Sequence, residues 1–341
     1  MSTQKNREIR LKRRPNGFPT EADFELAETA IPVAGPGQVL VRNSYMSVDP
    51  YMRGRMVDRE SYVPPFQIGE TLSGGAVGQV TASSNDKFKV GDYVSNFSGW
   101  REWFVSPGGD LQKIDPALAP LSAYLGTFGM PGLTAYAGLL KVGELKEGER
   151  VFVSGAAGAV GAVVCQIAKN KGCYVVGSAG SDDKCDWLLN EARVDKAINY
   201  KTCGDLTTAV RAAFPQGIDV YFDNVGGSHL DAALANMRAQ GRIAVCGMIA
   251  QYNATEPPPG PSNIIMVIPQ RLTIRGFIVS DYGSLMPDFI RDMGGWAKAG
   301  KLKWKETILD GIENAPKAFI GLFKGDNMGK MLVRVGPDKA V

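Results

Sequence analysis

Histidine is almost missing from this 341-residue sequence, and cysteine is missing from its first 164 residues. The one histidine is His229, and the five cysteines all lie between residues 165 and 246. Zinc sites need thiolates, imidazoles or carboxylates clustered at short spacings, and serine or cysteine nucleophiles need an imidazole beside them. We therefore expect no metal site and no hydrolytic triad. His229 follows a glycine pair, where we expect a capping or surface role.

Long apolar runs are also missing. None reaches the length of a membrane span, and none follows the basic N-terminus as in a signal peptide. The net charge is only +3, and the basic residues between Lys5 and Arg14 alternate with Ile9 and Leu11 as in a solvated edge strand. We expect a cytoplasmic protein with reduced, mostly buried thiols and with neither a membrane nor a nucleic-acid partner.

A strand, a glycine turn and a helix start follow one another between residues 151 and 169. Val151–Val153 is a β-rich apolar run, Gly158 and Gly161 fill two positions of a G-x-G-x-x-G turn, and Ala162–Lys169 has helical apolar spacing. Such a turn lets backbone amides approach a dinucleotide pyrophosphate at a helix N-terminus. Ala156 occupies the first glycine position, so a tight turn without a ligand stays open as the alternative.

Further apolar runs, each followed by a polar turn or a helical segment, continue the pattern. They are Tyr174–Gly177, Ala197–Tyr200, Asp219–Asp223 and Arg242–Cys246. This alternation predicts an α/β domain with a doubly wound parallel (Rossmann) sheet, whose ligand lies at the carboxyl ends of the strands.

The end of the second strand favours NADPH over NADH. NAD-binding domains place a carboxylate there for the ribose 2′-hydroxyl, whereas this strand runs into Gly177–Ser181 without one. Ser181, Lys184 and Tyr200 could bind a 2′-phosphate instead. Asp182 and Asp183 weaken this prediction, unless they serve as the acidic first turn of the next helix.

The N-terminal region, residues 1–128, has short β-rich runs separated by glycine and proline, which predicts a barrel-like β domain. The tail, residues 305–341, ends in a strand-like segment that we expect to return to that domain. Residues 129–304 would then be a nucleotide-binding domain inserted between the two pieces. The proline run Pro257–Pro261 follows the fifth strand and is either a rigid connector or a pocket wall.

Several motifs in order carry a resemblance to a known superfamily. They are Val48–Arg53, Gly129–Tyr136, Ala156–Gly161, Phe222–Gly227, Tyr252–Asn253 and Asn327–Lys330. Across essentially its whole length the sequence resembles the medium-chain dehydrogenase/reductase superfamily, in the zinc-independent leukotriene 12-hydroxydehydrogenase/prostaglandin reductase branch. Two stretches, Tyr252–Glu256 and Asp310–Pro316, are most similar to the bacterial NADPH-dependent curcumin reductases. The N-terminal part would then be the GroES-like catalytic domain of that fold.

The resemblance implies that NADPH reduces the carbon–carbon double bond of an α,β-unsaturated ketone or aldehyde by hydride transfer to the β-carbon, with no metal. It places Gly158, Ala159, Val160 and Gly161 on the pyrophosphate, and Ser181, Lys184 and Tyr200 near the adenosine phosphate. It places Asn224, Cys246, Gly247, Tyr252, Phe277, Ile278, Val279 and Asn327 along the rest of the cofactor. Tyr51, Tyr62, Met130 and Tyr282 would face the substrate.

One departure concerns the group that stabilises the enolate. Ile268 or Pro269 stands where animal prostaglandin reductases carry a tyrosine, and neither can donate a hydrogen bond. Tyr252 is our candidate for that role, although a purely packing role stays open. The alternatives for the whole chain are an NADPH quinone reductase and a non-catalytic NADPH-binding redox sensor. Related enzymes also suggest a homodimer that pairs through Thr273–Phe277.

Overall fold

The structure is a computed structural model that describes residues 5–339. The chain divides into two compact units, one formed by Met1–Leu125 with Glu306–Val341 and the other by Gly126–Lys305. The two units are called here the outer unit and the inserted unit, and each is described by itself.

The inserted unit is built on a six-stranded parallel sheet with strand order β10-β9-β8-β11-β12-β13. In chain order this is 3-2-1-4-5-6, the order of dinucleotide-binding domains, with its switch point between β8 and β11. The strands are β8 (Arg150–Val153), β9 (Tyr174–Ala179), β10 (Lys196–Asn199), β11 (Ile218–Asp223), β12 (Met237–Val245) and β13 (Thr273–Gly276).

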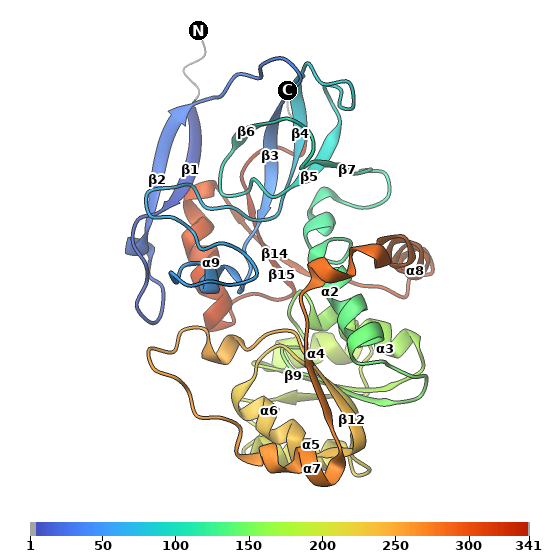
Figure 1. The fold of residues 1–341 in the computed structure, drawn as a ribbon. Helices are drawn as coiled ribbons and strands as arrows, with labels where there is room; N and C mark the ends of the chain where they lie inside the picture. The colour runs from blue at the N-terminus through green and yellow to red at the C-terminus, as the bar shows by residue number, and fades with distance from the viewer. Residues whose placement is uncertain (1–4, 340–341) are drawn as a thin grey trace. The chain divides into compact units, whose positions relative to one another are not determined.

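Successive residues of these strands face two separate hydrophobic cores. Val151 and Val153 belong to one core, while Phe152 between them belongs to the other. Because neighbouring side chains on a strand point to opposite faces, the continuous apolar runs reflect a sheet covered on both sides. One face carries α2 (Met130–Ala137), α3 (Gly161–Asn170), α4 (Asp182–Asn190) and α8 (Met286–Lys298), and the other carries α5 (Leu206–Ala213), α6 (Gly227–Leu234) and α7 (Val267–Gln270) (Figure 1).

The outer unit is mainly β structure. Its seven-stranded sheet has the order β14-β15-β3-β4-β5-β7, with β6 paired to β3, and β1 and β2 form a separate antiparallel pair. The strands are β1 (Lys5–Leu11), β2 (Phe24–Ala30), β3 (Val39–Ser47), β4 (Ala76–Ser83), β5 (Tyr93–Asn96), β6 (Trp103–Ser106), β7 (Gln112–Lys113), β14 (Glu306–Asp310) and β15 (Lys330–Arg334).

The C-terminal segment completes this unit. Strand β15 pairs antiparallel with β3, and helix α9 (Ala315–Lys324) lies beside the N-terminal strands in Figure 1. Phe319 of α9 contacts Phe24 and Trp100 edge to face at ring-centroid distances of 6.1 and 6.3 Å. A short helix α1 (Met52–Arg55) follows β3. The predicted fold class, a doubly wound sheet inserted into a β-rich domain, is confirmed.

No helix within residues 5–339 is long and apolar enough to cross a membrane. The predicted basic edge strand is β1, and its charges are paired with acidic neighbours. The pairs here and in the loop that follows are Lys5–Glu28, Arg7–Glu102, Arg10–Glu8, Arg13–Asp23 and Arg14–Asp58.

Candidate functional site

The turn between β8 and α3 brings backbone into close contact with backbone. A Cβ on Gly161 would lie 2.4 Å from the carbonyl oxygen of Gly155, and a Cβ on Gly158 would lie 3.2 Å from the same atom. Gly155 itself has a φ of +57°. The turn therefore leaves no room for side chains at these glycines, and an anion can approach the amides at the start of α3.

Ala156 replaces the first glycine of the motif, and the neighbouring strand explains why it fits. Ala156 is fully buried, and a Cβ on Gly177 of β9 would lie 2.7 Å from the Cβ of Ala156. The methyl group of Ala156 thus fills the space that the missing side chain of Gly177 leaves. The altered motif keeps a turn that fits a pyrophosphate.

A buried carboxylate organises the switch point of the sheet. Oδ1 of Asp223, at the end of β11, accepts hydrogen bonds from the Tyr221 hydroxyl at 2.6 Å and from the Ser154 hydroxyl at 3.1 Å. It also accepts from the amides of Val225 and Gly226 at 2.9 and 2.8 Å. Burial raises the pKa of Asp223, against the opposing effect of these donors. The carboxyl group thus holds the loop that follows β11.

Asn224 joins the two strands that border the switch point. Its amide N donates to Oγ of Ser154 at 2.9 Å, and its Nδ2 donates to the carbonyl oxygen of Ser154 at 2.7 Å. The carboxyl ends of β8 and β11 are therefore tied together where a dinucleotide crosses such sheets. Ser154 and Asp223 received no role in the sequence analysis.

The end of β9 carries the residues expected to bind an adenosine phosphate. Ser181 caps α4 and accepts from the amide of Lys184 at 3.4 Å. A Cβ on Gly180 would lie 2.8 Å from the Tyr200 hydroxyl, so the bare glycine lets the Tyr200 ring lie over the strand end. Asp182 lies in the first turn of α4, and its Oδ1 accepts from Nδ2 of Asn199 at 2.7 Å. Ser181, Lys184 and Tyr200 thus lie near the end of the same strand.

The expectation of a surface position for His229 is wrong. His229 lies in α6 with 2 % of its surface exposed, and its ring meets the ring of Tyr200 edge to face at a centroid distance of 4.9 Å. Within residues 5–339 its Nε2 has no hydrogen-bond partner. Burial lowers its pKa to about 4. The glycine pair Gly226–Gly227 lies at the start of α6, and this helix carries His229 on its buried side.

The loop after β12 places Tyr252 against its own backbone. The Tyr252 hydroxyl accepts from the amide of Met248 at 3.2 Å, and a Cβ on Gly247 would lie 2.8 Å from that hydroxyl. The amides of Cys246 and Gly247 donate to the carbonyl oxygen of Asp223. Burial, and then the charge of Asp223, raises the pKa of Cys246 to about 12.

The segment after β13 contributes aromatic packing. The Phe277 ring contacts Phe222 and Tyr282 edge to face at 6.3 and 6.1 Å, and a Cβ on Gly138 would lie 2.4 Å from Cζ of Phe277. Ile278 and Val279 are half-buried beside it, as is Met130 at the start of α2. Ile268, in α7, is 72 % exposed.

In the outer unit, Tyr51 and Tyr62 share Arg55 as a charged neighbour. Burial, followed by the charge of Asp49, raises the pKa of Tyr51, and Arg55 hydrogen-bonds to its hydroxyl. Tyr62 is largely exposed. Asn327 lies in the loop before β15, where its Nδ2 donates to the carbonyl oxygen of Gly329 at 2.7 Å.

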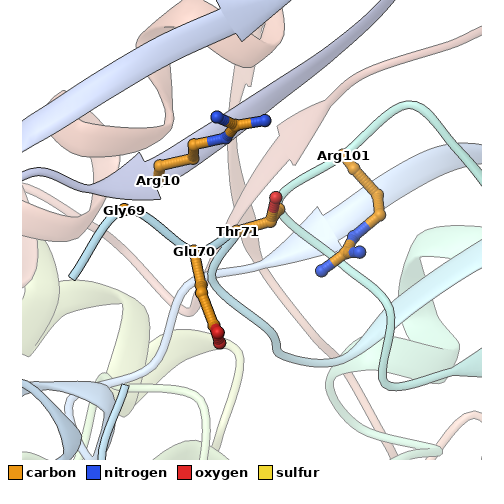
Figure 2. A pocket seen from close by; sticks show the side chains of 5 residues that line it. All are labelled: Arg10, Gly69, Glu70, Thr71 and Arg101. Atoms are coloured by element: carbon orange, nitrogen blue, oxygen red, sulfur yellow. The ribbon is translucent and has the colours of Figure 1, made fainter. Parts of the chain in front are cut away.

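A polar pocket of about 460 Å³ opens on the outer unit, lined by Arg10, Gly69, Glu70, Thr71 and Arg101 (Figure 2). The guanidinium of Arg10 pairs with Glu8 at 2.7 Å, and Nη2 of Arg101 donates to the carbonyl oxygen of Leu72 at 3.0 Å. Glu70 adds a negative charge beside these arginines. The pocket contains none of the expected site residues, and its balanced charges do not suit an apolar ligand.

Two family descriptions match the sequence. Residues 7–114 match the N-terminal domain of oxidoreductase, and residues 159–293 match zinc-binding dehydrogenase. The chain is 45% identical to the NADPH-dependent curcumin reductase of Escherichia coli, over 98% of each chain. The chain belongs to the medium-chain dehydrogenase/reductase superfamily. The predicted resemblance to bacterial NADPH-dependent curcumin reductases is thereby confirmed.

Two further members of the superfamily support this placement. The NADP(+)-dependent 2-alkenal reductase of Nicotiana tabacum is 47% identical over 97% of each chain. The crystal structure of CurA from Vibrio vulnificus in complex with NADPH superposes with a TM-score of 0.92 at 41% identity, covering 97% of this chain and 99% of that one. The superfamily fold therefore extends over both units.

Zinc, which one family description names, does not fit the donors of this chain. Among residues 5–339 no group of three or more histidine, cysteine, aspartate or glutamate side chains could hold a metal ion. All five cysteines are free thiols, and the thiols of Cys165, Cys173 and Cys185 are buried, with pKa values raised by burial.

Proposed function

We propose that this chain reduces the carbon–carbon double bond of α,β-unsaturated ketones and aldehydes with NADPH. The observation that carries the proposal is the identity of 45% and 47%, over nearly the whole chain, to reductases named for curcumin and 2-alkenals. Three features of the inserted unit support the proposal: its glycine turn, the switch point of its sheet between β8 and β11, and the position of Ser181, Lys184 and Tyr200 near the end of β9.

When bound, NADPH supplies the hydride that the β-carbon of the enone receives. The chain's own part is to bind the cofactor along the carboxyl ends of β8, β11 and β12, and to stabilise negative charge on the carbonyl oxygen. A preorganised hydrogen-bond donor performs that second task without a metal. Tyr252 is the proposed donor, because its hydroxyl is held against Gly247 and Met248 in the loop after β12.

The remaining site residues are part of the same proposal. Ser181, Lys184 and Tyr200 bind the 2′-phosphate and select NADPH. Asn224, Cys246, Gly247, Asn327 and the Phe277–Val279 segment line the rest of the cofactor, and Tyr51, Tyr62, Met130 and Tyr282 face the substrate.

NADPH oxidation with a linear alkenal, a curcuminoid and a quinone tests the activity, with products identified by mass spectrometry and NMR. We expect saturated ketones or aldehydes with the carbonyl intact. Turnover of the quinone alone would favour a quinone reductase. Tight NADPH binding without any turnover would favour a redox sensor.

Substitution of Tyr252 by phenylalanine tests the proposed donor. Loss of one preorganised donor lowers kcat by roughly 10²-fold, so we expect a loss of that size in the kcat of Tyr252→Phe at saturating NADPH. Tyr174→Phe is the matched control, because its hydroxyl donates only to the carbonyl oxygen of Ala213 among the bonds described, at 3.1 Å. Equal kcat in both variants and the wild type would contradict the assignment.

A cytoplasmic homodimer completes the proposal. All four residues of the edge strand β13 are exposed, Ile274 among them, and the segment that leads into the strand carries the exposed isoleucines Ile264, Ile265 and Ile268. An unpaired edge beside apolar side chains favours pairing with a second copy. Free thiols at all five cysteines suit a reducing compartment.

A further inference from the structure

The outer unit buries a lysine that the proposed chemistry does not use. Lys330, at the start of β15, has 4 % of its surface exposed. Its Nζ donates to the carbonyl oxygen of Val48 at 2.9 Å, to Oδ1 of Asp49 at 3.0 Å and to the carbonyl oxygen of Met331 at 3.1 Å. All three donors of the ammonium are thus in use.

Asp49 connects this lysine to the segment that carries Tyr51. Its Oδ2 accepts a hydrogen bond from the Ser47 hydroxyl, and its carbonyl oxygen accepts from the amide of Met52 at 3.1 Å. The charge of Asp49 acts on the Tyr51 hydroxyl two residues along the chain. The position of Tyr51 therefore depends on a carboxylate whose counter-ion is Lys330.

The loop that carries Asn327 is anchored at the same point. Lys330 ends this loop, and Nδ2 of Asn327 donates to the carbonyl oxygen of Gly329, a residue with a φ of +69°. The amide of Met328 donates to the Thr307 hydroxyl at 3.0 Å. The ammonium of Lys330 therefore joins two segments that are about 280 residues apart in sequence. One segment carries Tyr51, which we assign to the substrate side, and the other carries Asn327, which we assign to the cofactor side.

A second carboxylate faces Lys330 from the neighbouring strand. Glu306 pairs with Lys330 in the β14–β15 register. Burial raises the pKa of Glu306, while a hydrogen bond from Ser122 and the charge of Lys330 oppose that shift. Ser122 lies just before the chain leaves the outer unit after Leu125, and Glu306 is the first residue after its return. The chain therefore leaves the outer unit, and returns to it, within a few residues of this cluster.

Burial of these charges is difficult to explain by stability alone. Desolvation of a buried ion pair often outweighs its attraction, and apolar side chains of similar volume commonly serve a core as well. Three aliphatic residues could have filled this space. The charged cluster instead joins the two segments that carry Tyr51 and Asn327, and its burial can fix the position of both.

We propose that Lys330, with Asp49 and Glu306, is a positioning residue that holds Tyr51 and Asn327 in their working places. The inference rests on the proposed function, since it assigns Asn327 to the cofactor and Tyr51 to the substrate. It adds a role for residues that touch neither ligand. The lysine acts by fixing two loops, and transfers no proton.

The test is Lys330→Met, which keeps the length of the side chain and removes its charge. Calorimetry measures the Kd of NADPH and of adenosine 2′,5′-bisphosphate, a fragment that reaches only the phosphate donors of the inserted unit. A misplacement of about 1 Å lowers the reaction rate by up to roughly 10²-fold. We therefore expect kcat/KM for the enone to fall by about tenfold or more. We also expect the Kd of NADPH and the KM for the enone to rise, and the Kd of the fragment to stay unchanged.

Lys317→Met is the matched control, because Lys317 is an exposed lysine of α9 in the same unit. It should leave all of these quantities unchanged. Should Lys330→Met not fold, Asp49→Asn carries the same comparison, since it removes the counter-ion and keeps the side-chain shape. Unchanged NADPH affinity and unchanged KM in the folded variant would overturn the proposal, as would an equal loss for NADPH and for the fragment.

The two proposals can fail separately. If the wild type reduces no enone, the proposed function fails, while the paired affinities for NADPH and the fragment still decide the role of Lys330. If the wild type reduces enones and Lys330→Met behaves like Lys317→Met, only the inference about Lys330 fails.

Discussion

At the scale of single residues, the buried carboxyl group of Asp223 fixes the loop that follows β11 at the switch point of the sheet. Its Oδ1 atom accepts from two hydroxyls and two backbone amides. A buried polar group left without its partner costs about 1–3 kcal/mol, so each donor is committed to one position. Ser154 is shared between Asp223 and Asn224, and its small hydroxyl therefore joins both sides of the switch point.

His229 leads to a prediction about stability against pH. Its pKa is about 4 in the folded chain, against 6.5 for an exposed histidine. The unfolded chain therefore takes up a proton below pH 6.5 that the folded chain refuses until about pH 4. Stability is complete above pH 6.5 and falls as the pH drops toward 4, with a loss of about 2 kcal/mol at pH 5 from this group.

Urea unfolding of the wild type and of His229→Phe at pH 7.5 and pH 5 measures this contribution. Phenylalanine keeps a ring beside Tyr200 and has no proton to gain. We expect the free energy of unfolding to fall less between the two pH values in the variant than in the wild type. An identical fall in both proteins would show that His229 is not the neutral buried group described here.

At the scale of secondary-structure elements, the turn from β8 into α3 shows how little space the site leaves. Gly161 begins α3 and stands against the carbonyl oxygen of Gly155. Backbone atoms form both sides of that contact, so a side chain at Gly161 could be accommodated only by distortion of the main chain. By contrast, Gly295 lies in α8 with no atom within 4 Å of the position of its Cβ.

Alanine at these two glycines should therefore have opposite effects. Gly161→Ala forces backbone apart, and we expect a destabilisation of about 1–3 kcal/mol together with weaker NADPH binding. Gly295→Ala gains helix propensity in an open position and should stabilise by up to about 1 kcal/mol. Thermal unfolding and a cofactor titration of both variants measure these effects. Equal behaviour of the two variants would contradict the close contact at Gly161.

At the scale of the whole molecule, the chain makes one unit from its two ends and the other from its middle. Strand β15 lies beside β3, so the sheet of the outer unit is complete only when the C-terminal segment has joined the N-terminal strands. Within the inserted unit, β10 and β13 are the edges of the sheet. Strand β13 is the edge with exposed residues throughout, and the segment that leads into it carries exposed isoleucines.

The state of association is the prediction at this scale. We expect a dimer in sedimentation velocity, and we expect Ile268→Lys to shift it toward the monomer, because Ile268 is 72 % exposed beside that edge. Ile290→Lys is the control, since Ile290 is 54 % exposed on α8 of the same unit. A monomeric wild type, or equal dissociation by both lysines, would exclude pairing through β13.

Local sequence patterns were sufficient to predict the alternation of strands and helices, the parallel sheet and the return of the tail to the N-terminal domain. These follow from local periodicity and glycine placement, which act over a few residues. The glycine turn was predicted on the same basis. Ser181, Lys184 and Tyr200 stay predicted phosphate donors, because each stands within a few positions of a strand end.

Only the tertiary structure decided which distant polar groups meet. Four features depend on contacts between separate strands or distant parts of the chain. They are the contact of Ala156 with Gly177, the hydrogen bond between Ser154 and Asp223, the burial of His229 and the ion pair of Lys330 with Asp49. Hydrophobic periodicity states which face of an element is buried, and it leaves open which neighbour that face meets. The order and register of the strands determine which residues become neighbours. A polar group can be buried without loss of stability only where one of these neighbours is a hydrogen-bond partner.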